Sequence, residues 1–403
     1  MQKPSSSPAL RPVPAPSARS WSAHAVRRIE ADFQRSSDTH LIPVPLAGYP
    51  GIDLYFKDES SHPTGSLKHR LARSLFLYAL CNGWLHAAST VVEASSGSTA
   101  ISEAYFARLL GLPFVAVMPH TVSSEKIAAI EFYGGRCHLV ADPTTIYSES
   151  QRLAAELNGH YMDQFTYAER ATDWRANNNI AQSIFTQMKL ERHSVPTWLV
   201  ASAGTGGTLA TLGRYVRYHA EPAQDTLQNP PQNSSQNSSQ SQAQSLTQVC
   251  GVDAERSVFY DYYQTRDKAL TLAQGSRIEG IGRPRVEESF LPDAIDAMVK
   301  VPDVWSLGAM HALSDVLGRP VGGSSGTNLV AALRVAHHMQ QQGQTGSIVT
   351  ILCDSGARYR HTYFDDAWLS QCGLGCSLQK DAVKLWMHSG TAPVDSGVLV
   401  TGV

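Results

Sequence analysis

Short apolar runs alternate with longer amphipathic stretches through most of the chain. Runs typical of buried strands lie at 54–57, 90–93, 114–118, 198–201, 249–253 and 347–352. Between them, apolar residues recur every three or four positions, which predicts helices near 67–78, 100–110, 124–133, 209–216 and 329–339. Strands that alternate with helices in this way predict an α/β fold, with parallel sheets flanked by helices.

Two segments interrupt this pattern. The first 19 residues are rich in Pro and Ser and lack the apolar centre of a secretory signal, so residues 1–38 are predicted to be a largely disordered tail. Residues 222–248 consist almost wholly of Gln, Asn, Ser and Pro. Such a tract cannot bury enough apolar surface to offset the entropy of ordering it, and it is predicted to be a disordered insertion. The ordered unit would span 39–369, with 370–403 as a C-terminal extension.

Composition narrows the range of partners. The chain has 403 residues and a net charge of -2, without the concentrated basic excess that a nucleic-acid or membrane-surface partner needs. No apolar run approaches the roughly 18 residues of a membrane span. Six cysteines are too few for a disulfide framework, and Cys372 and Cys376 have no second pair with which to bind a metal. Reduced thiols and a cytoplasmic location are therefore expected, with no metal site.

A glycine-rich turn carries the first chemical signal. Gly204-Thr-Gly-Gly-Thr208 follows an apolar strand and opens a helical run. Successive backbone N–H groups in such a turn can point at one anion, and the helix dipole adds to the attraction. The turn has neither the Gly-Lys-Ser/Thr ending of a P-loop nor the glycine order of a dinucleotide site. It predicts a phosphate cradle, although an ordinary glycine-rich turn has the same composition.

A lysine at a predicted helix N-terminus is the second signal. Lys68 lies in Pro63-Thr-Gly-Ser-Leu-Lys68-His-Arg70, at the start of a helix with one apolar face. A lysine at such a position is ordinarily a solvated surface group, and the helix dipole disfavours its positive charge. The same field lowers the ammonium pKa, as an imine-forming lysine requires.

Three further loops follow predicted strands or open predicted helices. They are Ser95-Ser-Gly-Ser-Thr-Ala100, Gly322-Gly-Ser-Ser-Gly-Thr-Asn328 and Asp354-Ser-Gly-Ala-Arg-Tyr359. Hydroxyl and N–H groups that converge at the first loop suit a carboxylate, but any Ser-rich helix cap looks the same. In parallel α/β folds, ligands bind beyond the carboxyl ends of the strands. We therefore expect all five loops to meet at the same ends of the strands and to form one binding site. The five loops together indicate such a site more strongly than any single loop does.

These motifs resemble the fold-type-II pyridoxal-phosphate enzymes, and among them the cysteine synthase and cystathionine β-synthase group. The resemblance runs from about 39 to 369, apart from the insertion. The family's lysine motif appears as Ser66-Leu-Lys68-His-Arg70, its substrate loop as 95–100 and its phosphate loop as 204–208. Its Gly-Ile-Gly and Ser-Ser-Gly segments appear at 280–282 and 324–326. The resemblance implies two interleaved α/β lobes, like those of the tryptophan synthase β subunit.

The resemblance also implies a role for each matching residue. Lys68 would carry pyridoxal 5′-phosphate and act as the catalytic base. The other cofactor-binding residues would be Ser98, Gly204, Thr205, Gly206, Gly207, Thr208 and Ser324. The substrate would be bound by Ser95, Ser96, Gly97, Thr99, Gln164 and Gly280. Two positions depart from the family pattern: Ser98 replaces an asparagine that contacts the cofactor, and His69 replaces an aspartate.

Three functions remain open from the sequence. The whole chain looks most like the bacterial cysteine desulfhydrases of this group, which implies β-elimination on L-cysteine to pyruvate, ammonia and hydrogen sulfide. A neutral Ser324 at the ring nitrogen would weaken electron withdrawal and favour prompt loss of the β-substituent. The alternatives are a β-replacement on O-acetylserine or serine, and a catalytically silent binding scaffold. A homodimer that acts on a small amino acid is expected.

Overall fold

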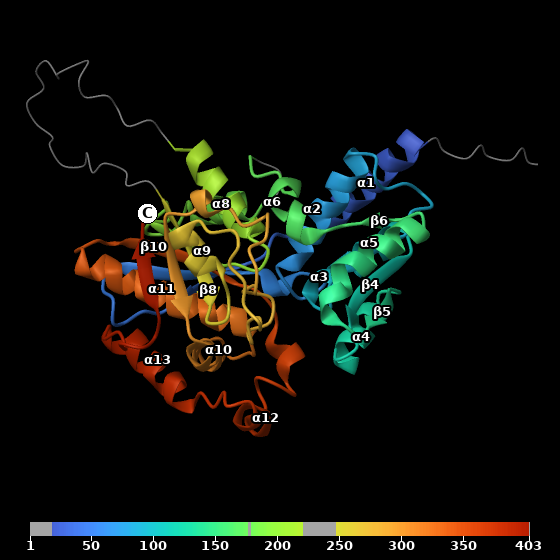
Figure 1. Ribbon diagram of the computed structural model, residues 1–403. Coiled ribbons are helices and arrows are strands. Elements are labelled where there is room, and N and C mark those ends of the chain that lie inside the picture. The colour runs from blue at the N-terminus through green and yellow to red at the C-terminus, as the bar shows by residue number, and fades with distance from the viewer. Residues whose placement is uncertain (1–17, 176–178, 221–246, 403) are drawn as a thin grey trace, which may run out of the picture.

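The structure, a computed structural model, describes residues 18–175, 179–220 and 247–402. Its strands form a seven-stranded sheet and a four-stranded sheet, which lie in two lobes side by side (Figure 1). The predicted tail up to residue 17, and the predicted insertion up to residue 246, lie outside the described residues. Most predicted strands and helices are present within a few residues of the expected bounds, and the predicted fold class is confirmed.

The larger lobe is built on the seven-stranded sheet, in the order β1-β2-β10-β7-β8-β9-β11. The five central strands are parallel, and β1 and β11 pair antiparallel at the two edges. The strands are β1 Leu41–Val44, β2 Ile52–Asp58, β7 Trp198–Ser202, β8 Gln248–Ala254, β9 Ala297–Val301, β10 Gly346–Leu352 and β11 Val398–Thr401. Central strands such as β10 are buried along their whole length, as their continuous apolar runs require.

Helices cover both faces of this sheet. One core cluster joins it to α10 (Asp303–Leu317), α11 (Gly323–Gln341) and α13 (Ser377–Ser389). A second cluster joins its other face to α7 (Ile180–Met188), α8 (Gly207–Tyr218) and α9 (Phe259–Thr265). The short helix α12 covers Asp366–Gln371, and 3₁₀ turns lie at Glu59–Ser61, Pro143–Thr145, Pro292–Ala294 and Gly356–Tyr359.

Most of the smaller lobe is inserted between β2 and β7, so the chain leaves the larger lobe and returns to it, and α1, which precedes β1, packs against the inserted part. Its sheet has the parallel order β5-β4-β3-β6, with β3 Val91–Ala94, β4 Phe114–Pro119, β5 Arg136–Val140 and β6 His160–Tyr161. Its helices are α1 Ala18–Gln34, α2 Lys68–Cys81, α3 Ser98–Leu110, α4 Ser124–Glu131, α5 Ile146–Glu156 and α6 Gln164–Ala171. This insertion makes the two lobes interleaved in sequence.

The prediction of a disordered tail is wrong for residues 18–34, which form α1. Ala25 and Ile29 are buried, and Trp21 and Val26 pack against the same core cluster as α2 and α3. These apolar residues recur at helical spacing, so one face of α1 can be buried. The Pro and Ser composition of the first 19 residues concealed this pattern.

Two predicted bounds in the larger lobe are also wrong. Residues 370–403 are not an appendage, because α13 packs on α10 and β11 pairs with β9. Helix α11 begins at Gly323 instead of 329, so the predicted glycine-serine loop is the first turns of the helix. A side chain at Gly326 would lie 2.1 Å from the backbone oxygen of Ser306, which explains the glycine as a close helix contact.

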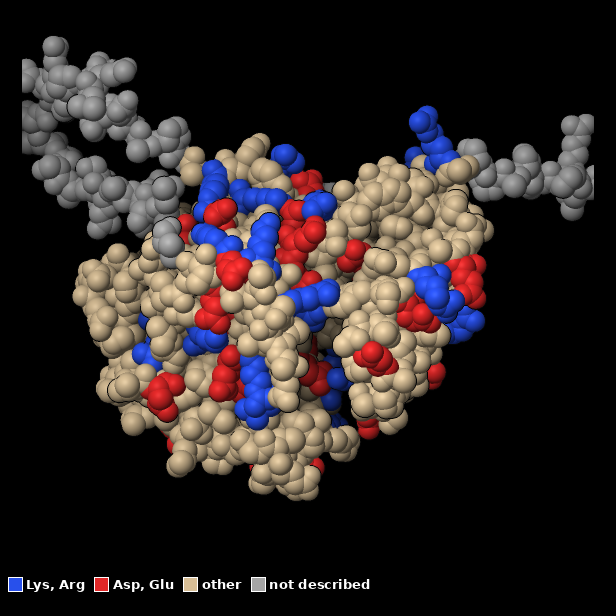
Figure 2. All heavy atoms as spheres, in the orientation of Figure 1, with Lys and Arg blue, Asp and Glu red and all other residues tan. Residues whose placement is uncertain are grey.

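On the face shown in Figure 2, basic and acidic side chains are interspersed, and a hollow separates the two lobes.

None of the helices in the described ranges has both the length and the apolar character that crossing a membrane requires. Cys376 is buried and Cys372 is exposed, and both are free thiols.

Candidate active site

A cavity of about 390 Å³ lies between the lobes and brings nearly all the predicted site residues together. It is lined by residues that follow β3, β7 and β10 and by the first residues of α2, α3 and α11. Of the predicted site residues, only Gly207 is absent from its lining. Residues far apart in the sequence therefore converge where parallel strands end, as the fold class predicts.

Lys68 is the first residue of α2 and lines this cavity. The side chain is half-buried, and its partial removal from solvent lowers the pKa of Lys68 from 10.5 to about 8. No carboxylate of the described residues forms an ion pair with its Nζ atom. The interpretation of Lys68 as a solvated surface lysine is therefore wrong. An uncompensated amine in this position is suited to react as a neutral nucleophile or base.

The glycine-rich turn lies opposite Lys68. Strand β7 ends at Ser202, and α8 begins at Gly207 after Gly206 has adopted a φ of +90°. A Cβ on Gly204 would lie 2.2 Å from the backbone oxygen of Gly280 and 3.7 Å from Lys68 Nζ. This close approach requires glycine, and it leaves the N-terminal amides of α8 available to an anion near the lysine.

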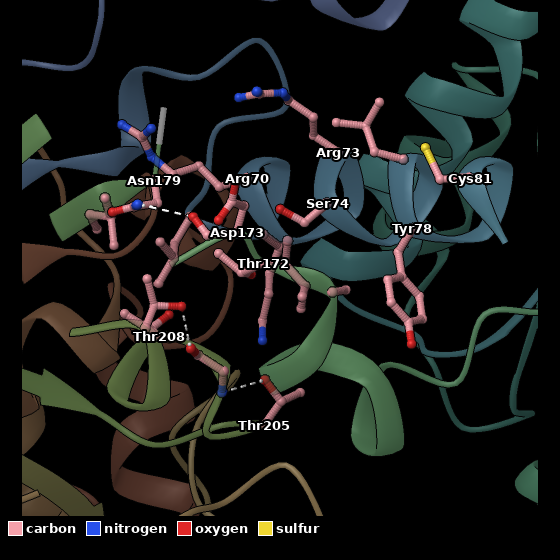
Figure 3. Close-up of a pocket in the computed structure, with 18 of the residues that line it drawn as sticks. Arg70, Arg73, Ser74, Tyr78, Cys81, Thr172, Asp173, Asn179, Thr205 and Thr208 are labelled. Carbon is pink, nitrogen blue, oxygen red and sulfur yellow. Dashed lines mark hydrogen bonds between the residues drawn. The ribbon is translucent and has the colours of Figure 1, made fainter. Parts of the chain in front are cut away.

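A second cavity reaches the same turn from the side of α2 and α6 (Figure 3). Lys68, Thr205 and Thr208 line both cavities, and Gly207 lines only this one. Thr205 Oγ1 accepts a long hydrogen bond, 3.5 Å, from the Gly207 amide. The turn therefore has one side toward the cleft between the lobes and the other toward this second cavity.

The serine-rich loop connects β3 to α3 on the other wall of the cleft. Thr99 Oγ1 donates a 2.8 Å hydrogen bond to Oε1 of Gln164, which is the first residue of α6. Ser98 Oγ accepts a 2.5 Å hydrogen bond from Arg358 of the larger lobe. Arg358 was missed as a site residue, although its loop, 354–359, was singled out. His69 points elsewhere: it is buried against the rings of Tyr105 and Phe106.

Ser324 and Cys353 lie together on the floor of the cleft. Ser324 is buried in the first turn of α11 and lines the cavity together with Cys353, whose thiol accepts a 3.4 Å hydrogen bond from Asn328 Nδ2. Burial raises the pKa of Cys353 to about 12, so this thiol stays neutral. Cys353 was not predicted, and its position directly before the loop at 354–359 was the available signal. The polar groups at this end of the cleft are therefore a hydroxyl and a thiol.

An arginine that lines the cavity joins the two lobes. Arg283 donates hydrogen bonds to the Tyr147 hydroxyl at 2.5 Å and to Glu287 at 2.9 Å. Its guanidinium lies 4.1 Å from the centre of the Phe165 ring. Arg285 shares the Glu287 carboxylate at 3.2 Å. Sequence reasoning missed this group, and two arginines close to Gly280–Gly282 were the signal.

Comparison with known families decides the identity. A family model described as pyridoxal-phosphate dependent enzyme matches residues 34–354. The chain belongs to the pyridoxal-phosphate dependent enzymes. The predicted family and cofactor are thus confirmed.

Individual relatives of this pyridoxal-phosphate dependent enzyme include proteins of cysteine metabolism. An L-cysteine desulfhydrase of Mycobacterium tuberculosis is 55% identical over 88% of this chain and 91% of that protein. A cysteine synthase of Dictyostelium discoideum is 29% identical over 81% of both. The crystal structure of an O-ureido-L-serine synthase superposes with a TM-score of 0.65 at 25% identity, over 82% of this chain and 96% of that one.

The residues of the cleft fit pyridoxal phosphate. The half-buried Lys68 amine, with its lowered pKa, lacks a carboxylate ion-pair partner among the described residues, as the lysine that binds this aldehyde should. The turn at 204–208 presents amides to a phosphate within reach of that amine, and side chains larger than glycine are excluded at Gly204. Ser324 offers a neutral partner to a ring nitrogen. The individual contacts remain predictions.

Proposed function

We propose that this enzyme is an L-cysteine desulfhydrase, which converts L-cysteine and water into pyruvate, ammonia and hydrogen sulfide. The observation that carries the proposal is the 55% identity to a mycobacterial L-cysteine desulfhydrase over nearly the full length of both chains. The half-buried Lys68 amine and the intact turn at 204–208 support it from the structure. They also argue against the silent-scaffold alternative, which has no need of either.

Binding would divide between the two walls of the cleft. Amides of the turn formed by Gly204, Thr205, Gly206, Gly207 and Thr208 would hold the cofactor phosphate, assisted by the dipole of α8. Ser95, Ser96, Gly97, Thr99 and Gln164 would hold the substrate carboxylate on the opposite wall, with Gly280 beside it. Pyridoxal phosphate, when bound, supplies a conjugated ring that withdraws electrons from the substrate Cα. The two lobes thus orient cofactor and substrate against each other.

Lys68 would then move the proton. Its pKa near 8 keeps far more of the amine neutral close to physiological pH than a solvated lysine would have, so Nζ can accept the α-proton of the substrate. Ser324 and Cys353 remain neutral, so they would not favour a protonated ring nitrogen. Weaker electron withdrawal disfavours a long-lived carbanion and favours loss of the β-sulfur. The chemistry of these residues therefore suits elimination better than transamination.

The second candidate is a β-replacement, because cysteine synthases are also among the relatives. The experiment that separates the two is product analysis with purified holoenzyme. One sample receives L-cysteine alone, and another receives O-acetylserine with sulfide. A desulfhydrase releases equal amounts of sulfide and pyruvate in the first sample, and Lys68→Ala abolishes the release. Efficient cysteine formation in the second sample, with no pyruvate in the first, would refute the proposal.

We further propose a homodimer in the cytoplasm. The dimer rests on the resemblance to the cysteine synthase group, and sedimentation equilibrium tests it. Six free thiols suit a reducing compartment. Cell fractionation with an antibody to the chain tests the location.

A further inference from the structure

Two glutamates lie behind the serine-rich loop, and neither has been given a role so far. Glu93 is the third residue of β3, and Glu103 lies in α3, one turn beyond the end of the loop. Both side chains are completely buried. Two carboxyl groups without solvent need partners, since an isolated buried charge is strongly unfavourable.

The two carboxyl groups have unequal partners. Glu93 accepts hydrogen bonds from the Ala94 amide at 2.7 Å and from the Gln164 amide at 3.2 Å. No donor among the described residues reaches either oxygen of Glu103, and its hydrogen-bonding neighbour is the Glu93 carboxyl itself. Two ionised carboxylates cannot hydrogen-bond to each other. The pair must therefore retain a proton, and the two amides at Glu93 favour placing that proton on Glu103.

The surroundings agree with a retained proton. Burial raises the pKa of Glu103 and of Glu93 above the usual range. Glu93 raises the pKa of Glu103 further, whereas the hydrogen bond from Glu103 lowers the pKa of Glu93, so the proton resides on Glu103. The charged groups that act on the pair are Lys68 from α2 and Asp163 at the start of α6. The Tyr161 hydroxyl of β6 is buried without a partner in the described ranges and also lies near the pair.

The pair connects directly to the predicted substrate site. Glu93 holds the backbone of Gln164, whose side chain holds Thr99 through a 2.8 Å hydrogen bond. We propose that Glu103 is a positioning residue: it donates its proton to Glu93, and this pair holds Gln164 and Thr99 in place for the carboxylate of an amino-acid substrate. This inference rests on the proposed function in one respect, namely that the substrate carboxylate binds beside Gln164 and Thr99.

Loss of the shared proton would disrupt this arrangement. At alkaline pH two adjacent anions would repel each other inside the lobe, and Gln164 would lose its fixed position. Substrate affinity should then fall, while the chemistry at Lys68 is affected less directly. Glu103→Gln has an amide that donates to Glu93 at every pH, so it should remove this alkaline loss. Glu103→Leu has a similar size but no donor, so it should weaken binding at every pH.

The test uses holoenzyme and two amino acids from about pH 6.5 to about pH 9.5. Steady-state kcat and KM are measured with L-cysteine, and the dissociation constant is measured by calorimetry with L-alanine, which has no leaving group. The expected result at neutral pH is a KM within about two-fold of wild type for Glu103→Gln. Glu103→Leu should raise KM and the L-alanine dissociation constant about ten-fold, the effect of one unsatisfied buried group.

The matched control is Glu169→Gln, because Glu169 is a buried glutamate that pairs instead with Arg170 and Arg214. It should retain the wild-type dependence of L-alanine binding on pH. Glu103→Leu binding L-alanine as tightly as wild type, or Glu103→Gln keeping the alkaline loss, would overturn the inference. L-alanine binding tests Glu103 even if L-cysteine yields no sulfide, so failure of the proposed function would be seen separately.

Discussion

The uncompensated amine of Lys68 should destabilise the protein when the cofactor is absent. The unfolded chain keeps the lysine proton up to about pH 10.5, whereas the folded chain releases it near pH 8. The folded state therefore carries the full penalty below about pH 8, and the penalty disappears between about pH 8 and about pH 10.5. The difference between the two pKa values corresponds to about 3 kcal/mol. Lys68→Met, which is apolar and of similar length, should be more stable than wild type by this amount at pH 7.

Urea denaturation of the cofactor-free proteins measures this difference. The advantage of Lys68→Met should fall from about 3 kcal/mol at pH 7 to about 1 kcal/mol at pH 9.5. Lys57 supplies the matched control, since burial also lowers its pKa to about 8. Its Nζ donates to the Thr39 carbonyl at 2.6 Å and to Gln187 at 2.7 Å. Lys57→Met leaves both acceptors without this donor, a loss of about 1–3 kcal/mol that offsets the relief of its own charge penalty, so this variant should gain much less stability than Lys68→Met.

Lys68 and Lys57 have similarly lowered pKa values, but only Lys57 Nζ has hydrogen-bond acceptors, so the two variants should differ clearly in stability. If Lys68→Met were no more stable than wild type at pH 7, or if its advantage did not shrink with rising pH, the amine would not be the source of the penalty. The position of the Lys68 amine would then not lower the free energy of unfolding, although its lowered pKa implies that it should.

Three further variants test other parts of the site. Gly204→Ala places a Cβ 2.2 Å from a backbone oxygen, so cofactor affinity should fall about ten-fold or more in a cofactor titration, whereas Gly375→Ala, which meets nothing within 4 Å, should bind normally. Ser324→Ala should keep the cofactor but release sulfide more slowly, and Ser324→Asp should slow release further by favouring a protonated ring nitrogen; a wild-type rate for Ser324→Asp would contradict this role. Arg283→Met removes the contacts to Tyr147 and Glu287 and should raise KM several-fold with a smaller change in kcat, and an unchanged KM would show that this contact between the lobes does not contribute to binding.

Much of the site could be predicted because local patterns determine it. Glycines in the turn at 204–208 are required by a close backbone approach, and hydroxyl residues at 95–99 begin a helix at the end of a strand. Such features depend on neighbours in sequence, so they are visible without the fold. Each of these loops follows a strand of a parallel α/β fold, so the sequence could also predict that they meet beyond the carboxyl ends of the strands.

The remaining features depend on contacts between distant residues. The Arg358 to Ser98 hydrogen bond joins positions 260 residues apart, and nothing near either residue indicates it. Glu103 looks in sequence like a solvated helix residue, because only the packing of the lobe determines that it is buried. Cys353 gains its neutral character from burial as well. Sequence patterns predict what a residue can do, but the packed lobes determine its surroundings.

Strand β11 has a consequence for protein handling. It pairs along the outer side of β9, which would otherwise present unpaired N–H and C=O groups to solvent. An uncovered strand edge is a template for pairing with other chains. A truncation after Leu369 removes β11 together with α13, which packs against α10. Such a shortened chain would keep every residue that lines the cleft. It should nevertheless aggregate on expression, because the exposed edge of β9 can pair with strands of other chains.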